Sequence, residues 1–301
     1  MTDNAPVSPA RAFAVGAFGI ATFSCMDAVM KGLVIAIGIF DTMFWRSAIA
    51  AAMAGLVWLA FRRRRPTRAA MRLHLVRGAV STVMALLFFW GLARVPMAQA
   101  IALSYIAPLL ALGLAAILLH ERIARTAVIA SLVAFAGVGV ILIGQSRAEL
   151  GHDAFVGAVA ILVSAFCYGW NIILMRQQSL AADPIEIIFF QNLVVAALLA
   201  LAAPWFASPF PVNHAPALIG AAFLATASLG ILAWAYAHAP ASYLAPTEYT
   251  SFLWATFFGY TIFGEIVSLW TIAGAVLIVG GCIVAARRKP QPFADAETLL
   301  P

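Results

Sequence analysis

Charged side chains stand inside stretches of this sequence that are otherwise almost wholly apolar, and they are the first candidates for chemistry. Asp27 and Lys31 are four residues apart, about one helical turn, so they can pair directly. Arg46 can reach toward water, or it can pair with Asp27 or with Asp41. A structural ion pair and a substrate-binding charge explain these residues equally well, so the sequence leaves both explanations open.

Glu248 is an acidic residue that lies inside an apolar stretch near the end of the chain. A carboxyl group in such a position can carry a proton between two states, or it can meet an ammonium group. We therefore take Glu248 as the candidate coupling residue of a proton-linked transport step. The alternative is that Glu248 only anchors a helix end near His238, and that transport runs down the substrate gradient.

Aromatic, hydroxyl and amide side chains gather near the middle of several apolar stretches. Flat rings suit the apolar part of a neutral amino acid, and hydroxyl and amide groups suit its carboxylate and ammonium. The expected substrate-binding residues are Ser104, Tyr105, Tyr168, Trp170, Asn171, Tyr249 and Trp254. For any single serine or threonine, a bond to its own helix backbone is the simpler explanation, and it is the clustering on several stretches that favours a cavity.

Pro108 lies in the middle of the fourth apolar stretch and is the expected hinge. Its ring denies the carbonyl of Ser104 its usual helical bond, which tends to bend the helix. Pro246 stands in the first turn of the ninth stretch, where proline is tolerated. We therefore expect a midspan proline on this helix in the first half of the chain only.

The elements that must position these residues are membrane helices. The chain of 301 residues is 64% hydrophobic and 10% charged, which is typical of polytopic membrane proteins, and a span needs about 20 mostly apolar residues. We predict an all-α polytopic membrane protein with ten transmembrane helices, at residues 12–35, 40–61, 70–93, 97–119, 124–144, 155–177, 184–206, 215–238, 243–263 and 266–286. The fifth and tenth spans are almost bare of polar groups, so we expect them outside the cavity. We expect the first, third, fourth, sixth, eighth and ninth to surround it.

Basic residues gather in alternate connections between these spans. Residues 62–72, 122–125 and 287–289 hold most of them. Because basic loops stay in the cytoplasm, we expect both termini there. Anionic lipid headgroups suffice to explain the net charge of +6, so no nucleic-acid partner is implied. The N-terminus has no basic region before its first apolar run, which favours a retained span over a cleaved signal peptide.

The chain contains an internal repeat. Residues 90–121 align without a gap with residues 234–265. The alignment places Trp90 on Trp234, Pro96 on Pro240, Tyr105 on Tyr249 and Glu121 on Glu265. We therefore divide the chain into two halves of five spans, 11–145 and 155–288. Because five is odd, the second half enters the membrane from the opposite side, and the halves are inverted repeats, an arrangement typical of secondary transporters.

Two five-span halves that each end their fourth span in a glutamate, HER at 120–122 and GE at 264–265, resemble the drug/metabolite transporter superfamily with two EamA-type domains. Within it, the chain is similar to the YddG-type exporters of amino acids. The resemblance implies a multi-pass exporter of the cell inner membrane that acts on small neutral metabolites, with aromatic and other neutral amino acids as the expected substrates. Export as the direction of transport comes from this resemblance alone.

Two other classes compete with a secondary transporter. An intramembrane enzyme needs a nucleophile with a base, or a pair of aspartates, at depth, and Asp27 is the only midspan aspartate. A channel would show symmetry about a central axis or a charged ring. Cys25, Cys167 and Cys282 lie inside spans without metal-ligand spacing, so we expect no metal and no cofactor. The implied partners are the small-molecule substrate and membrane lipids, and a monomer is the simplest oligomeric state.

Overall fold

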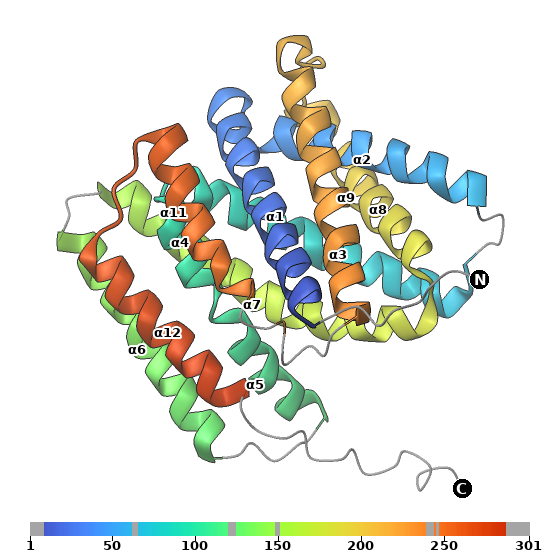
Figure 1. The fold of residues 1–301 in the computed structure, drawn as a ribbon. Coiled ribbons are helices and arrows are strands. Elements are labelled where there is room, and N and C mark those ends of the chain that lie inside the picture. Colours follow the sequence, from blue (N-terminus) through green and yellow to red (C-terminus); the bar gives the residue numbers. More distant parts are fainter. Residues whose placement is uncertain are drawn as a thin grey trace, which may run out of the picture.

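The computed structural model describes residues 9–61, 66–119, 125–147, 151–238, 244 and 247–286, and the regular structure in these ranges is helical (Figure 1). The helices are α1 (Pro9–Ile37), α2 (Ile39–Phe61), α3 (Arg68–Leu92), α4 (Met97–Ser104), α5 (Ala107–Leu119), α6 (Arg125–Arg147), α7 (Gly151–Ala181), α8 (Pro184–Phe206), the short 3-10 helix η1 (Val212–His214), α9 (Ala215–His238), α11 (Thr250–Phe263) and α12 (Leu269–Ala286). Eight of the predicted spans each correspond to one helix, namely α1, α2, α3, α6, α7, α8, α9 and α12.

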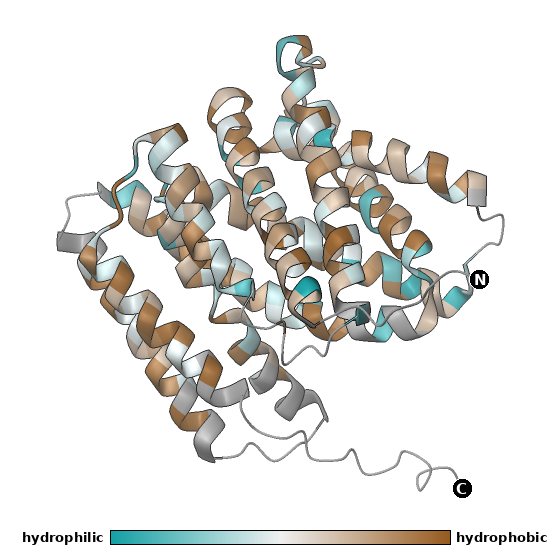
Figure 2. Cartoon of the chain, viewed as in Figure 1, coloured by the Kyte–Doolittle hydropathy of each residue, from teal (hydrophilic) through white to brown (hydrophobic). Residues whose placement is uncertain are grey.

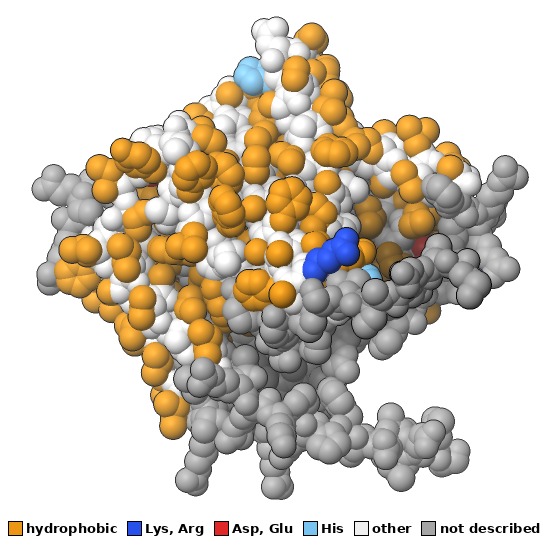
Figure 3. All heavy atoms as spheres, viewed as in Figure 1, with side chains coloured by type: hydrophobic (Ala, Val, Ile, Leu, Met, Phe, Trp, Pro, Cys, Tyr) orange, Lys and Arg blue, Asp and Glu red, His pale blue; other side chains and the backbone are white. Residues whose placement is uncertain are grey.

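The described helices have the length and the surface of membrane spans. Six stretches are long and apolar enough to cross a bilayer: Ala10–Ile37, Ile39–Ala60, Arg68–Leu92, Gly151–Met175, Pro184–Phe206 and Val212–Ala235. Large hydrophobic side chains such as Leu56, Leu201 and Trp205 are exposed on their outer faces. Hydrophobic residues run along the helices in Figure 2, and hydrophobic side chains are spread over the described part of the face in Figure 3, with few charged ones among them. A surface of this kind requires lipid contact, so the chain is an all-helical multi-pass membrane protein.

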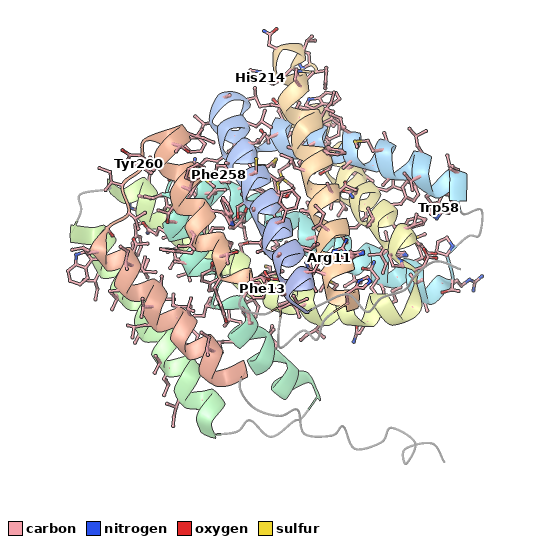
Figure 4. The ribbon with its side chains drawn as sticks, viewed as in Figure 1. Arg11, Phe13, Trp58, His214, Phe258 and Tyr260 are labelled. Carbon is pink, nitrogen blue, oxygen red and sulfur yellow. The ribbon has the colours of Figure 1, made fainter. Side chains whose placement is uncertain are left out.

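Helices of the first half of the chain pack against helices of the second half in an exchange pattern, that is, a set of contacts that stays the same when the two halves are swapped. The most extensive contacts join α6 to α12, α3 to α7, α1 to α9 and α2 to α8. In Figure 1, α6 and α12 lie side by side at one edge of the molecule. Gly137 and Gly274 permit this approach, because a Cβ on Gly137 would stand 2.7 Å from the Gly274 carbonyl oxygen. Figure 4 labels Arg11 near the start of α1 and His214 just before the start of α9. The two helices pack side by side but begin at opposite ends of the pair, so they run antiparallel.

The fourth predicted span is not one continuous helix, which corrects the prediction for residues 97–119. Tyr105 and Ile106 form a turn between α4 and α5. The Tyr105 N–H donates to the Ala102 carbonyl at 3.3 Å and the Ile106 N–H to the Leu103 carbonyl at 3.4 Å, so the last turn of α4 tightens. Pro108 follows directly, and because it has no N–H it cannot restore the regular ladder.

The ninth predicted span is interrupted too. Among its described residues, α11 begins only at Thr250, and Tyr249 lies in a turn. Hydroxyl groups bond the backbone here, because Thr250 Oγ1 donates to the Thr247 carbonyl at 2.6 Å and Ser251 Oγ to the Glu248 carbonyl at 2.6 Å. Such bonds compete with the helical ladder, which explains a second break. The two breaks occur at Tyr105 and Tyr249, which are equivalent in the sequence repeat, although Pro246 lies outside the described residues.

An ion pair joins α1 to the end of α11. Lys31 pairs with Glu265, and the Lys31 ammonium also donates to the Val95 carbonyl oxygen at 2.7 Å. Glu265 Oε2 accepts the Met97 N–H at 2.7 Å. The alternative pairing of Lys31 with Asp27 is therefore wrong. We call this group, Lys31, Val95, Met97 and Glu265, the α1–α11 clamp. Glu121, the repeat counterpart of Glu265, lies outside the described residues.

Candidate functional site

A cavity of about 720 Å³ lies between the helices of the two parts of the chain. Its walls come from α1, α2, α3, α4, α5, α7, α8, α9 and α11, together with residues of the two turns. Among the described residues, α6 and α12 contribute nothing to it, as the sequence led us to expect for the fifth and tenth spans. The contributions of α2 and α8 were not expected, and they include Arg46, Gln191 and Asn192. Arg46 was already a candidate substrate-binding charge in the sequence, whereas the amides of Gln191 and Asn192 on the seventh span were overlooked.

Most of the residues predicted from the sequence line this cavity. Seven of them do so: Ser104, Tyr105, Pro108, Tyr168, Asn171, Glu248 and Tyr249. Trp170 and Trp254 are not among its lining residues, which corrects their expected position. Trp170 lies two residues from Tyr168 and thus on the opposite side of α7. The Trp254 ring packs instead against Phe258, with the ring centroids 6.3 Å apart.

The two repeat-related tyrosines meet at the cavity wall. The rings of Tyr105 and Tyr249 lie edge to face with centroids 5.4 Å apart, an arrangement that aromatic pairs favour. The Tyr105 hydroxyl is hydrogen-bonded to Ser251 Oγ at 2.6 Å and lies 3.2 Å from the Tyr249 carbonyl oxygen. Each tyrosine stands at the break of its own helix, so the irregular backbone of both breaks borders the cavity, where polar groups can be satisfied.

A buried polar network fixes one wall of the cavity. Arg77 Nε donates to Asn171 Oδ1 at 2.9 Å, and its Nη1 bonds Gln178 Oε1. Gln178 Nε2 bonds His74 Nδ1, and His74 Nε2 lies 3.0 Å from Glu186 Oε1. The network joins α3, α7 and α8, and it holds Arg77 at the cavity. Arg77 was absent from the predicted site, although an arginine inside an apolar run is the signal that could have identified it.

The cavity carries both signs of charge on a largely apolar wall. Asp27 and Glu248 contribute carboxyl groups, and Arg46 and Arg77 contribute guanidinium groups. Phe23, Phe88, Met26 and Met84 are among the apolar lining residues. Within the described part of the chain, no group of three or more His, Cys, Asp or Glu side chains could hold a metal ion. The arrangement suits a molecule with charged or polar groups and an apolar body.

Comparisons with known proteins agree with a membrane transporter. The sequence model of the EamA-like transporter family matches this chain over residues 11–143 and 155–287. The pseudopaline exporter CntI of Pseudomonas aeruginosa (strain UCBPP-PA14) is 29% identical over 272 residues, which cover 89% of this chain and 93% of that exporter. An uncharacterized transporter of Helicobacter pylori (strain J99) is 28% identical over 220 residues, 69% of this chain and 72% of that protein. One crystal structure of a protein has a TM-score of 0.59 at 22% identity, covering 94% of this chain and 100% of the other, and so shares the fold.

Proposed function

The chain belongs to the EamA-like transporter family, and we propose that it exports small neutral metabolites, above all amino acids, through the central cavity by alternating access. Members of this family are transporters rather than enzymes, and the chain is a multi-pass membrane protein. The observation that carries the proposal is the cavity, because aromatic rings and opposite charges from both parts of the chain face it. Such a lining suits a zwitterion with an apolar side chain.

An inverted repeat of five and five helices is the proposed basis of alternating access. The exchange pattern of helix contacts supports it, since swapping the halves turns the α1–α9 pair into the α7–α3 pair. The same swap leaves the pairs α2–α8 and α6–α12 unchanged. The two halves, 11–145 and 155–288, would then rock about this pseudo-symmetry.

We further propose that the chain lies in the inner membrane with both termini cytoplasmic. In that orientation, the α1–α11 clamp stands at the outer side, where Lys31, Met97 and Glu265 tie two helices and a loop together. Glu248, toward the other end, is exposed at the cavity. This contrast supports a state that is closed to the outside and open to the cytoplasm.

The substrate class is the most specific part of the proposal. A YddG-type amino-acid exporter agrees with the mixed lining of the cavity, whereas the exporter CntI is named for pseudopaline. The alternative is therefore an exporter of other small metabolites or drugs, or an uncoupled facilitator. A cavity of about 720 Å³ has room for such molecules, because drug-sized ligands occupy pockets of roughly 300–1,000 Å³.

Counterflow in proteoliposomes tests the proposal. Vesicles that contain the purified chain are loaded with one unlabelled amino acid and given the same radiolabelled amino acid outside, in a panel that covers aromatic, aliphatic and charged side chains. We expect accumulation of neutral amino acids, with protein-free vesicles as the control. Absence of counterflow for every amino acid, together with counterflow of a larger metabolite, would favour the alternative.

A further inference from the structure

Four of the residues that line the cavity, one on each of four helices, carry a buried polar atom without a hydrogen-bond partner among the described residues. They are Asp27 Oδ1 on α1, Arg46 Nε on α2, Ser81 Oγ on α3 and Gln191 Oε1 on α8. Asp27 is only 2% exposed and Ser81 only 6%. Native proteins rarely leave buried polar groups unsatisfied, so unpartnered atoms on residues that line a cavity are candidates to bind what the cavity holds.

Two of the polar groups first expected to hold a substrate, on Ser104 and Asn171, are by contrast already engaged within the protein. Ser104 Oγ donates to the Ala100 carbonyl at 2.9 Å. Asn171 Oδ1 accepts from Arg77 Nε at 2.9 Å, and Asn171 Nδ2 lies 3.8 Å from Met84 Sδ. Binding a substrate there would break existing bonds, whereas the four unpartnered atoms offer new ones. The Arg46 guanidinium has one long contact, from Nη2 to Ser47 Oγ at 3.5 Å, which leaves its Nε without a partner among the described residues.

Asp27 and Arg46 can carry opposite charges, and these attract each other through space when both groups are ionised, although no direct ion pair joins them among the described residues. The nearest cation along α1, Lys31, is held by Glu265 and the Val95 carbonyl. A molecule with an ammonium group for Asp27 and a carboxylate for Arg46 would therefore satisfy both charges, which a simple cation or a simple anion cannot do.

We propose that Asp27, Arg46, Ser81 and Gln191 form a head-group subsite for substrates that carry both a protonated amine and a carboxylate. Asp27 and the Gln191 carbonyl oxygen accept from the ammonium, and Arg46 and the Ser81 hydroxyl donate to the carboxylate. The apolar part of the substrate lies along Phe23, Phe88 and the other apolar lining residues. This assignment rests on the proposed export of small metabolites and moves recognition of the head group from α4 and α7 to α1, α2, α3 and α8.

Equilibrium binding to the purified full chain in detergent tests the subsite. The probes are L-phenylalanine, 2-phenylethylamine, which lacks the carboxylate, and 3-phenylpropionate, which lacks the amine. We expect the wild type to bind L-phenylalanine about 10-fold or more tightly than either analogue, because hydrogen bonds to charged groups are the strong ones. Arg46→Gln should weaken the binding of L-phenylalanine to the level of 2-phenylethylamine and leave the binding of 2-phenylethylamine unchanged. Asp27→Asn should weaken the binding of L-phenylalanine to the level of 3-phenylpropionate and leave the binding of 3-phenylpropionate unchanged.

Two serine variants provide a matched comparison. Ser24 and Ser81 are both buried hydroxyls without a partner among the described residues, but only Ser81 lines the cavity. Ser81→Ala should weaken L-phenylalanine a few-fold, whereas Ser24→Ala should leave its binding unchanged. Equal effects of the two variants would contradict the subsite.

The wild type alone can overturn the proposal, whatever the stability of the variants. Failure to bind L-phenylalanine, or equal binding of all three probes, would show that the head group is not read at this site. If Arg46→Gln does not give a monodisperse protein, Arg46→Lys replaces it. That variant should keep the preference for the zwitterion with a weaker affinity, and loss of discrimination without loss of affinity would count against the assignment.

Counterflow separates this inference from the proposed function. If the chain binds L-phenylalanine more tightly than both analogues but shows no counterflow of any amino acid, the subsite is supported and amino-acid export is contradicted. Counterflow of L-phenylalanine that persists unchanged in both Arg46→Gln and Asp27→Asn would keep export and remove the subsite.

Discussion

Removal of one charge from the α1–α11 clamp should destabilise the protein strongly. The side chain of Lys31 is 4% exposed and that of Glu265 is 15% exposed, so the ion pair is largely out of water. Glu265→Gln keeps an oxygen that can accept the Met97 N–H, but it leaves the Lys31 ammonium with no counter-charge. Breaking a buried pair in this way costs about 3–5 kcal/mol. Lys31→Met should cost less, because the remaining carboxylate keeps the 2.7 Å bond from Met97 and is nearer to water.

The double variant Lys31→Met/Glu265→Gln decides whether the pair itself is responsible. With both charges gone, neither is left uncompensated, and replacement of a buried ion pair by uncharged groups is often neutral. We therefore expect the double variant to be more stable than Glu265→Gln alone, with a coupling free energy of about 0.5–3 kcal/mol. Thr261→Val is a matched control on the exposed face of α11 and should change the free energy of unfolding by less than about 0.5 kcal/mol.

Denaturant unfolding in detergent micelles, with α-helical circular dichroism as the signal, measures these differences. Single-variant effects that simply add in the double variant would refute a coupled pair, even if each variant is destabilised. If Glu265→Gln is as stable as Thr261→Val, the expected cost of leaving the Lys31 charge buried without a counter-charge is refuted.

The remaining predictions concern topology, the cavity wall and coupling. With the native cysteines replaced, an impermeant thiol reagent applied from outside should label Asn213→Cys and spare Arg68→Cys; the reverse labelling would invert the proposed orientation. Tyr249→Ala should lower counterflow several-fold without loss of expression, whereas Trp170→Ala should leave it near the wild-type rate, since only Tyr249 lines the cavity; equal effects would mean that the cavity wall is wrongly assigned. If Glu248 couples transport to protons, a pH gradient should stimulate the wild type, and Glu248→Gln should lose this stimulation while it still exchanges substrate; an unchanged response would leave Glu248 as a helix anchor.

Helix positions could be predicted from the sequence because hydropathy acts locally. A run of about 20 apolar residues must be helical in lipid, whatever it packs against, since its backbone has no other way to satisfy its hydrogen bonds. The repeat alignment likewise paired Tyr105 with Tyr249, and in the structure their rings are in contact. The break at Tyr105 could be predicted only in part, because a proline marks an irregular point in a helix without showing whether the helix bends or stops there. The break at Tyr249 depends on hydroxyl-to-carbonyl bonds, which compete with a regular helix by margins too small to read from sequence.

The partners of the charged residues could not be predicted, because a pair that is close in the sequence contributes less free energy than contacts that form only in the folded protein. A pair four residues apart on a helix, such as Asp27 and Lys31, is worth only about 0.2–0.5 kcal/mol. Hydrogen bonds to a charged group inside a protein are worth about 1.5–3 kcal/mol each. Lys31 obtains two such contacts, from the Val95 carbonyl and from Glu265, which is 234 residues away in the sequence. The distant partners therefore win, and Asp27 loses the cation on its own helix. Its charge is left to Arg46 and to the cavity, so of the two roles that the sequence left open for Asp27, the structure favours the substrate-binding one that we propose.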